Sequence, residues 1–121
     1  MKNTIALKDS NDFQHILKKG RWAAGDMMSL YILPNTEGKN LLGIAVGKKF
    51  SKSSVKRNRV KRLIKEAYRL NETGICKGFS MVILWKNNVN YESVTYGNVC
   101  KDLLKCLKKA DVLIKEEEYN A

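Results

Sequence analysis

The spacing of apolar residues predicts a helix near the start of the chain and a set of strands after it. Phe13, Ile16 and Leu17 recur at helical spacing and Gly20 follows them, which predicts a short helix ending at this glycine. Strands are predicted where apolar residues alternate or run together, at residues 27–33, 41–48 and 79–85. A weaker pattern predicts a further short strand at residues 21–24.

Two longer amphipathic segments predict the remaining helices. A helix from Ser53 or Ser54 to about residue 70 would place one apolar stripe within about 60° of Val60, made of Val60, Leu63, Ile64 and Ala67. Residues 91–109 predict the last helix, with Val99, Leu103, Cys106 and Leu107 on one side. The order of these elements predicts an α+β fold, a single four-stranded sheet with helices packed on it.

Length and composition set the limits of this fold. The 121 residues suffice for one domain, 1–121, and 44% hydrophobic residues with one proline favour a folded chain. Residues 1–9 are expected to form an extended arm, and residues from about 115 to 121 a frayed tail. Ser10 or Asn11 is the expected cap of the first helix. No apolar run is long enough to cross a bilayer, so we expect a cytoplasmic protein without a membrane partner.

Cysteine and histidine do not form a metal-ligand pattern. Cys76, Cys100 and Cys106 include no C-x-x-C pair, and His15, the one histidine of the chain, lies far from them in sequence. We expect reduced thiols packed as small hydrophobic groups, and neither a metal site nor another cofactor in the protein itself.

Positive charge is concentrated in residues 48–69. This segment holds ten of the 23 lysines and arginines and a single acid, Glu66, so its net charge is +9 while the rest of the chain carries +2. On the predicted helix, the cations lie mostly opposite the apolar stripe. Lys61 with Lys65, and Lys65 with Arg69, are like charges four residues apart, which costs roughly 0.2–0.5 kcal/mol per pair.

This cationic face has three possible environments: solvent, a membrane surface or a polyanionic partner. An ordinary solvated helix would carry more Lys–Glu pairs. A membrane-bound helix needs a free apolar face, whereas here the neighbouring strands give that face a core to cover. A helix that retains so much repulsion favours a polyanionic partner. Arginine suits paired phosphate oxygens, and Asn58 adds both a donor and an acceptor, so nucleic acid is the favoured partner.

The basic segment resembles the Arg-Asn-Arg signature of the bacterial ribonuclease P protein subunits. The resemblance rests on the run from Val55 to Glu66 after Lys48-Lys49-Phe50, and the order of the other elements agrees over roughly residues 8–110. It implies a fold similar to domain 2 of ribosomal protein S5, with a left-handed strand–helix–strand crossover. The general rule for such crossovers favours the right hand.

The resemblance also implies a function and its partners. In that family the catalyst is an RNA subunit with bound Mg²⁺, which cleaves precursor tRNA to produce the mature 5′ end. The protein subunit binds this ribonuclease P RNA and the 5′ leader of precursor tRNA, and carries no catalytic residues. By this resemblance the chain is expected to be a monomeric accessory subunit of a ribonucleoprotein endonuclease.

Site residues follow from the resemblance position by position. The RNA-binding set would be Lys48, Lys49, Lys56, Arg57, Asn58, Arg59, Lys61, Arg62, Lys65 and Arg69. The leader would lie in a cleft between the first helix and the sheet, at Phe13, Leu17 and Tyr31. Leu17 stands where the family often has a second aromatic residue. Small residues of the second strand, among them Gly43, are expected to let the leader approach the backbone.

Two other functions remain as alternatives. A general RNA-binding protein, such as a ribosomal protein or an RNA chaperone, could use the same basic helix. A protein-only nuclease is disfavoured because the 12 acidic residues form no paired-carboxylate pattern on the strong strands, and because His15 has no evident triad partner. The Arg-Asn-Arg signature separates the ribonucleoprotein subunit from the general RNA-binding protein.

Overall fold

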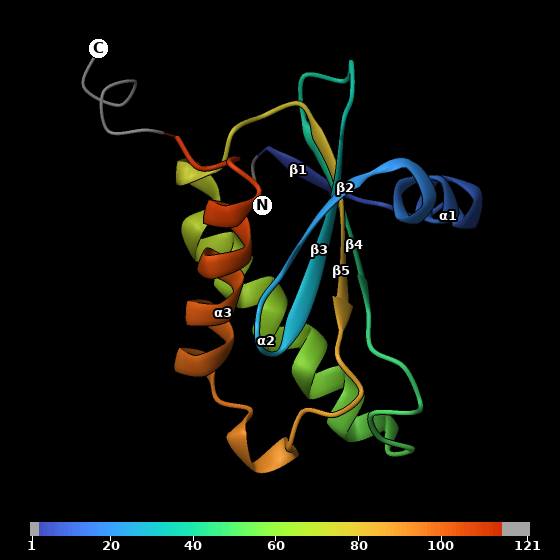
Figure 1. Ribbon diagram of the computed structural model, residues 1–121, viewed down its shortest axis with the longest axis vertical. Coiled ribbons are helices and arrows are strands. Elements are labelled where there is room, and N and C mark those ends of the chain that lie inside the picture. Colours follow the sequence, from blue (N-terminus) through green and yellow to red (C-terminus); the bar gives the residue numbers. More distant parts are fainter. Residues whose placement is uncertain (1–2, 115–121) are drawn as a thin grey trace.

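A computed structural model describes residues 3–114 as three layers, a central sheet with helices on both faces (Figure 1). Helix α1 packs on one face of the sheet, and α2 and α3 pack on the other. The elements in chain order are β1 (Thr4–Ala6), α1 (Ser10–Lys19), β2 (Arg21–Ala24), β3 (Met28–Pro34), β4 (Asn40–Ala45), α2 (Ser54–Asn71), η1 (Glu72–Gly74), β5 (Phe79–Trp85), η2 (Tyr91–Ser93) and α3 (Tyr96–Lys109).

The sheet has five strands, in the order β1-β4-β5-β3-β2. The prediction of four strands was therefore wrong, because the N-terminal segment taken for an extended arm contains β1, which pairs with β4 in parallel. The weakly predicted strand at residues 21–24 is confirmed as β2, antiparallel to β3. Both edges of the sheet are short strands of three and four residues, which limits the length of unpaired backbone that the sheet exposes.

Helix α2 connects two neighbouring parallel strands, β4 and β5. The sheet contains both parallel and antiparallel pairs and has helices packed on it, which confirms the predicted α+β class. The left hand of the crossover through α2 stays a prediction. The main core lies between the sheet and the pair α2–α3. It contains residues that are fully buried in alternating strand positions, such as Leu30, Ile32 and Ile83, and helix residues such as Ile64 and Leu103.

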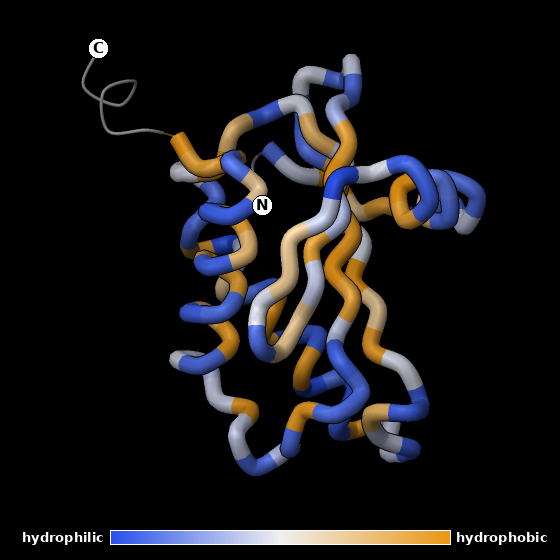
Figure 2. The backbone as a smooth tube through the Cα atoms, viewed as in Figure 1, coloured by the Kyte–Doolittle hydropathy of each residue, from blue (hydrophilic) through white to orange (hydrophobic). Residues whose placement is uncertain are grey.

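A smaller buried group lies on the opposite face of the sheet. Ile16 of α1 and Val82 of β5 are both buried but stand outside the main core cluster. Figure 2 shows the strands mainly hydrophobic and the helices banded by hydrophobic and hydrophilic residues, as amphipathic helices on a two-sided sheet require. Since α1 has only ten residues, it contacts β3 and β5 and leaves part of this face uncovered.

The boundaries of several elements differ from the prediction. Asp9, rather than Ser10 or Asn11, caps α1, and its carboxylate accepts a hydrogen bond from the backbone N–H of Asn11 at 2.8 Å. The segment predicted as the last helix is divided into η2 and α3, with Thr95 as the cap of α3. The predicted tail from about residue 115 lies outside the described residues.

Candidate nucleic-acid interface

Helix α2 is held to the core by the stripe that the sequence predicted. Val60, Ile64 and Ala67 are fully buried and Leu63 is partly buried, while Ser53 caps the helix by accepting a hydrogen bond from the N–H of Lys56 at 3.3 Å. Because one face of α2 is fixed in the core, the opposite face is exposed to solvent.

No helix among residues 3–114 is long and apolar enough to cross a membrane.

Most of the predicted RNA-binding side chains lie on this solvent side or in the loop before α2. Seven of the ten are exposed in the structure, and they are Lys48, Lys49, Lys56, Asn58, Arg62, Lys65 and Arg69. Lys61 is half-buried. These side chains concentrate positive charge on α2 and the loop before it, and such a surface attracts a phosphate backbone.

The two arginines of the Arg-Asn-Arg signature are also bound to the protein itself. Arg57 Nη1 donates to the carbonyl oxygen of Ser51 at 2.7 Å, and Arg59 Nη1 donates to that of Val94 at 2.9 Å. Each guanidinium has five N–H donors, so each retains donors for another partner. Arg57 thereby fixes the loop before α2, and Arg59 fixes the connection from η2 to α3.

An aromatic ring supports the cations at the start of α2. The ring of Tyr91 lies 4.9 Å from Lys56 Nζ and 5.4 Å from the guanidinium carbon of Arg59, both within cation–π range. Phe50 contacts the same tyrosine, with ring centroids 6.4 Å apart, and also contacts Trp85 edge-on at 5.9 Å. Trp85 is 4% exposed and belongs to the main core.

One acid interrupts the cationic face at its far end. Glu66 accepts hydrogen bonds from Arg69 at 2.6 and 3.2 Å, and this hydrogen bonding lowers the pKa of the Glu66 carboxyl. Glu66 pairs with Arg69 because residues three apart are neighbours on a helix. The net positive field is therefore strongest toward the N-terminal half of α2.

The predicted leader cleft lies on the other face of the sheet, under α1. The ring of Phe13 packs against the backbone of Gly43, where an added Cβ would lie 2.8 Å from Phe13 Cε2 and 3.2 Å from a methyl group of Leu7. The space above Gly43 is therefore occupied by Phe13 and Leu7, and the expectation that the small residues of this strand admit the leader stays a prediction. Phe13 and Leu17 are both partly exposed.

Tyr31 occupies the middle of this face. It lies on β3 opposite Val82 of β5, and Val82 in turn lies opposite Gly43 of β4. Its side chain is partly exposed. Its partner in β2 is Trp22, which is 67% exposed. The sequence prediction did not include Trp22, although a tryptophan next to the cations of residues 18–21 was a signal for it.

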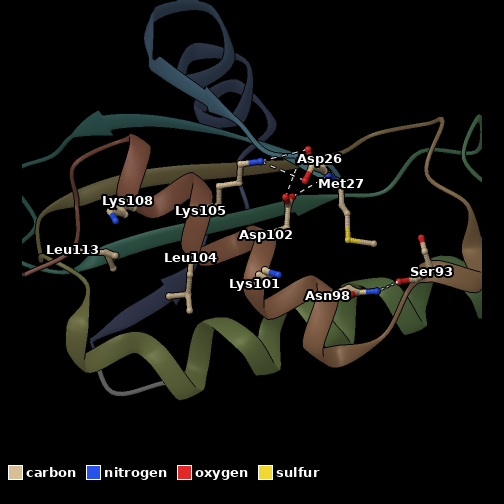
Figure 3. A pocket seen from close by; sticks show the side chains of 10 residues that line it. All are labelled: Asp26, Met27, Ser93, Asn98, Lys101, Asp102, Leu104, Lys105, Lys108 and Leu113. Carbon is tan, nitrogen blue, oxygen red and sulfur yellow. Dashed lines mark hydrogen bonds and ion pairs between the residues drawn. The ribbon is translucent and has the colours of Figure 1, made fainter.

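Two cavities are lined by residues other than the predicted site residues. The larger, of about 730 Å³, is bordered by α3 and the turn between β2 and β3 (Figure 3). In its wall, the carboxylate of Asp102 accepts hydrogen bonds from the backbone N–H groups of Asp26, Met27 and Met28 at 2.7, 2.9 and 3.1 Å. The smaller, of about 230 Å³, lies between α1 and the loop after β3. Neither cavity includes a predicted site residue.

The fold and the surface together define a small α+β protein that displays a concentrated cationic helix, a class typical of polyanion-binding proteins. The sequence matches the family model described as Ribonuclease P over residues 1–111. It is 37% identical to a ribonuclease P protein component of Clostridium botulinum (strain Langeland) over 107 residues, which covers 88% of this chain and 94% of the relative.

Solved structures of the same kind match the fold. A Staphylococcus aureus RNase P protein superposes with a TM-score of 0.79 at 29% identity, covering 90% of this chain and 97% of the other. A Thermotoga maritima RNase P protein gives a TM-score of 0.78 at 30% identity, covering 87% and 96%. The chain therefore belongs to the ribonuclease P protein family.

Proposed function

We propose that this chain is the protein subunit of a ribonuclease P ribonucleoprotein, which binds the catalytic RNA and the 5′ leader of precursor tRNA. The observation that carries the proposal is the exposed cationic face of α2 in a chain of this family. In this proposal the RNA subunit, with its Mg²⁺ ions, performs the endonucleolytic cleavage. The residues of the protein bind and orient the nucleic acids.

The cationic face of α2 is assigned to the RNA subunit. Asn58, Arg62 and Lys65 are exposed and carry no hydrogen bond to the protein among the described contacts of residues 3–114, so they are available to phosphates and to base edges. Arg57 and Arg59 hold the loop and the η2–α3 connection in place, and direct their remaining donors to the RNA. Because several phosphates are neutralised, binding falls steeply as salt concentration rises.

The partly exposed aromatic face under α1 is assigned to the leader. Unpaired bases stack on aromatic rings with little dependence on sequence, and each stacked base contributes roughly 1–3 kcal/mol. Tyr31 and Phe13 supply rings on this face, and Leu17 supplies an apolar contact. Such binding suits a leader whose sequence differs from one precursor tRNA to another.

Reconstitution with the cognate RNA tests the proposed function. Cleavage of precursor tRNA is measured at low Mg²⁺ concentration with the RNA alone, with the RNA and this protein, and with an Arg62→Ala variant. We expect the protein to stimulate cleavage and Arg62→Ala to require more protein for the same effect. A protein that binds the cognate RNA and an unrelated structured RNA equally, without stimulating cleavage, is instead a general RNA-binding protein.

A further inference from the structure

Trp22 is the most exposed aromatic side chain that the structure reports. It is 67% exposed, although tryptophan normally buries most of its large apolar surface, whereas the second tryptophan, Trp85, is 4% exposed. Trp22 lies in the middle of the edge strand β2 and is paired with Tyr31 of β3. Paired residues of antiparallel strands point to the same face, so Trp22 lies on the face that carries Tyr31.

The register of the sheet places these side chains in one row. Gly43, Val82, Tyr31 and Trp22 follow one another across β4, β5, β3 and β2. Phe13 covers the Gly43 end of the row, and Trp22 forms the opposite end. With about 4.8 Å between strands, the row spans about 14 Å, which is the length of about four stacked nucleotides.

The neighbours of Trp22 on this face are small. Two residues further along the strands, the next pair that points to the same face is Ala24 with Ser29. These side chains are too short to cover an indole ring. The main contacts of helix α1 with the sheet are to β3 and β5, not to β2. The face of the indole is therefore accessible to a flat ligand of similar size.

Charge near Trp22 favours a phosphate-bearing ligand over another protein. The last two residues of α1, just before β2, are Lys18 and Lys19, whereas Arg21 points to the opposite face of the sheet, where its Nη1 donates to the carbonyl oxygen of Ala110 at 3.0 Å. Lys18 and Lys19 are exposed at the end of α1. An aromatic ring beside clustered cations is the combination that single-stranded nucleic acid requires, since bases stack and phosphates are neutralised.

We propose that Trp22 is an additional stacking position for unpaired leader nucleotides, adjacent to the one at Tyr31. This inference rests on the proposed function, since it extends the leader surface by one strand. Cross-strand neighbours have Cβ atoms about 4.5–5.5 Å apart, so the two rings can each take one base of the same single strand. The leader then runs across the sheet from beneath α1 toward the edge strand β2.

The test uses the holoenzyme reconstituted with its cognate RNA. Affinity is measured for precursor tRNAs whose leaders are lengthened one nucleotide at a time, with the wild type, Trp22→Ala, Trp22→Phe and Tyr31→Ala. We expect the wild-type affinity to rise in steps, one step for each added nucleotide that stacks on a ring. Trp22→Ala should lose one of these steps, a decrease in affinity of about tenfold, as for one stacked base. Trp22→Phe keeps most of that step, and Tyr31→Ala loses a different one. Leu70→Ala, which removes another exposed apolar side chain (55%), leaves every step in place.

The possible outcomes separate the two proposals. If Trp22→Ala keeps every step while Tyr31→Ala loses one, the stacking role of Trp22 is overturned and the proposed function stands. If both variants keep every step, the leader surface itself is wrong. If Trp22→Ala changes only the sedimentation coefficient of the protein, this face is a contact between copies of the chain. Trp22 emission provides a direct readout, because we expect leader RNA to quench it while the buried Trp85 stays unaffected.

Discussion

The hydroxyl group of Tyr68 connects three parts of the fold in its interior. It lies 2.8 Å from Thr4 Oγ1 of β1 and 3.4 Å from Asn40 Nδ2 of β4, and the tyrosine is fully buried. Asn40 in turn donates to the carbonyl oxygen of Cys76 and accepts from the N–H of Phe79. The side chain of Tyr68 therefore links α2 to β1 and β4.

Replacing Tyr68 by Phe is expected to reduce the free energy of unfolding by about 1–2 kcal/mol, because the buried Thr4 hydroxyl loses its partner. Urea denaturation at neutral pH measures this loss. The same change at Tyr96, which is 37% exposed, is the control and should have little effect. A Tyr68→Phe protein as stable as the wild type would show that this hydrogen bond contributes nothing.

The same residue gives a pH dependence with a defined sign. Burial raises the pKa of Tyr68 above its ordinary value of 10.0, so the folded state favours the neutral phenol. The resulting stabilisation is complete below pH 10 and is lost as the pH rises above it, where the unfolded chain ionises first. The stability difference between the wild type and Tyr68→Phe should therefore shrink as the pH is raised past 10, and urea denaturation at several pH values measures it.

Asp102 is a second interior polar residue with a structural role. Its carboxylate receives three backbone N–H groups from the turn between β2 and β3, and Gly25 leaves room for it, since a Cβ there would overlap the carboxylate oxygens. Asp102→Asn places an amide N–H₂ against these donors, and should cost about 2–4 kcal/mol of stability, measured by thermal or urea unfolding. The matched control Asp26→Asn alters an exposed carboxylate in a long 3.4 Å ion pair, and should change stability little.

Sequence reasoning could not identify these two residues. Tyr68 lies at the edge of the apolar stripe of its helix, and its partners lie 64 and 28 residues away. Asp102 lies on the apolar side of α3, three residues after Val99 and four before Cys106, but its partners lie about 75 residues earlier, so the spacing does not show what the carboxylate binds. Hydrogen bonds between distant segments leave no periodic signal, whereas Val60 and Ile64 could be predicted because helical periodicity is local.

At the scale of the element, helix α2 combines the surface proposed to bind RNA with hydrogen bonds to other parts of the protein. Its cap, its length and its buried stripe followed from local patterns, and all three were predicted correctly. The internal bonds of Arg57 and Arg59 could not be predicted, because their acceptors lie in a loop and in a connection whose positions depend on the whole fold. The two roles of these arginines can be separated by comparing them with Arg62.

Arg62→Ala is expected to weaken RNA binding and to reduce the slope of log K against log salt by about one, with stability unchanged within about 0.5 kcal/mol. Arg59→Ala should weaken RNA binding and also cost about 1–2 kcal/mol of stability, because it removes the bond to Val94 and the contact with Tyr91. Filter binding over a salt series and urea denaturation measure the two quantities. Equal stability of the two variants would contradict the internal role of Arg59.

At the scale of the molecule, the sheet separates the two proposed surfaces. Helix α2 lies on one face of the sheet and α1 on the other (Figure 1). Phe13 lies on α1, and Tyr31 and Trp22 are paired in β3 and β2. The class of the fold could be predicted from the order of helices and strands. The fifth strand could not, because Thr4–Ala6 is short and its parallel partner begins at Asn40, so no hairpin or alternation marks it.

Since the surfaces lie on different layers without shared residues, substitutions on them should act independently. We expect Tyr31→Ala to weaken leader binding equally with and without Arg62→Ala, with a coupling free energy within about 0.5 kcal/mol. The measurement is precursor tRNA affinity of the four holoenzymes at protein concentrations that saturate the RNA subunit. A coupling well above that value would show that the sheet transmits changes between its faces.

The strand order also determines when the chain can fold during synthesis. The pair β1–β4 and the hairpin β2–β3 are both complete once Ala45 has been made, yet they touch each other only through β5, the central strand. A nascent chain that ends before Phe79–Trp85 therefore holds two half-sheets with unpaired inner edges. Helix α2 is synthesised before β5, so its cationic face is present before the sheet that it covers can be completed.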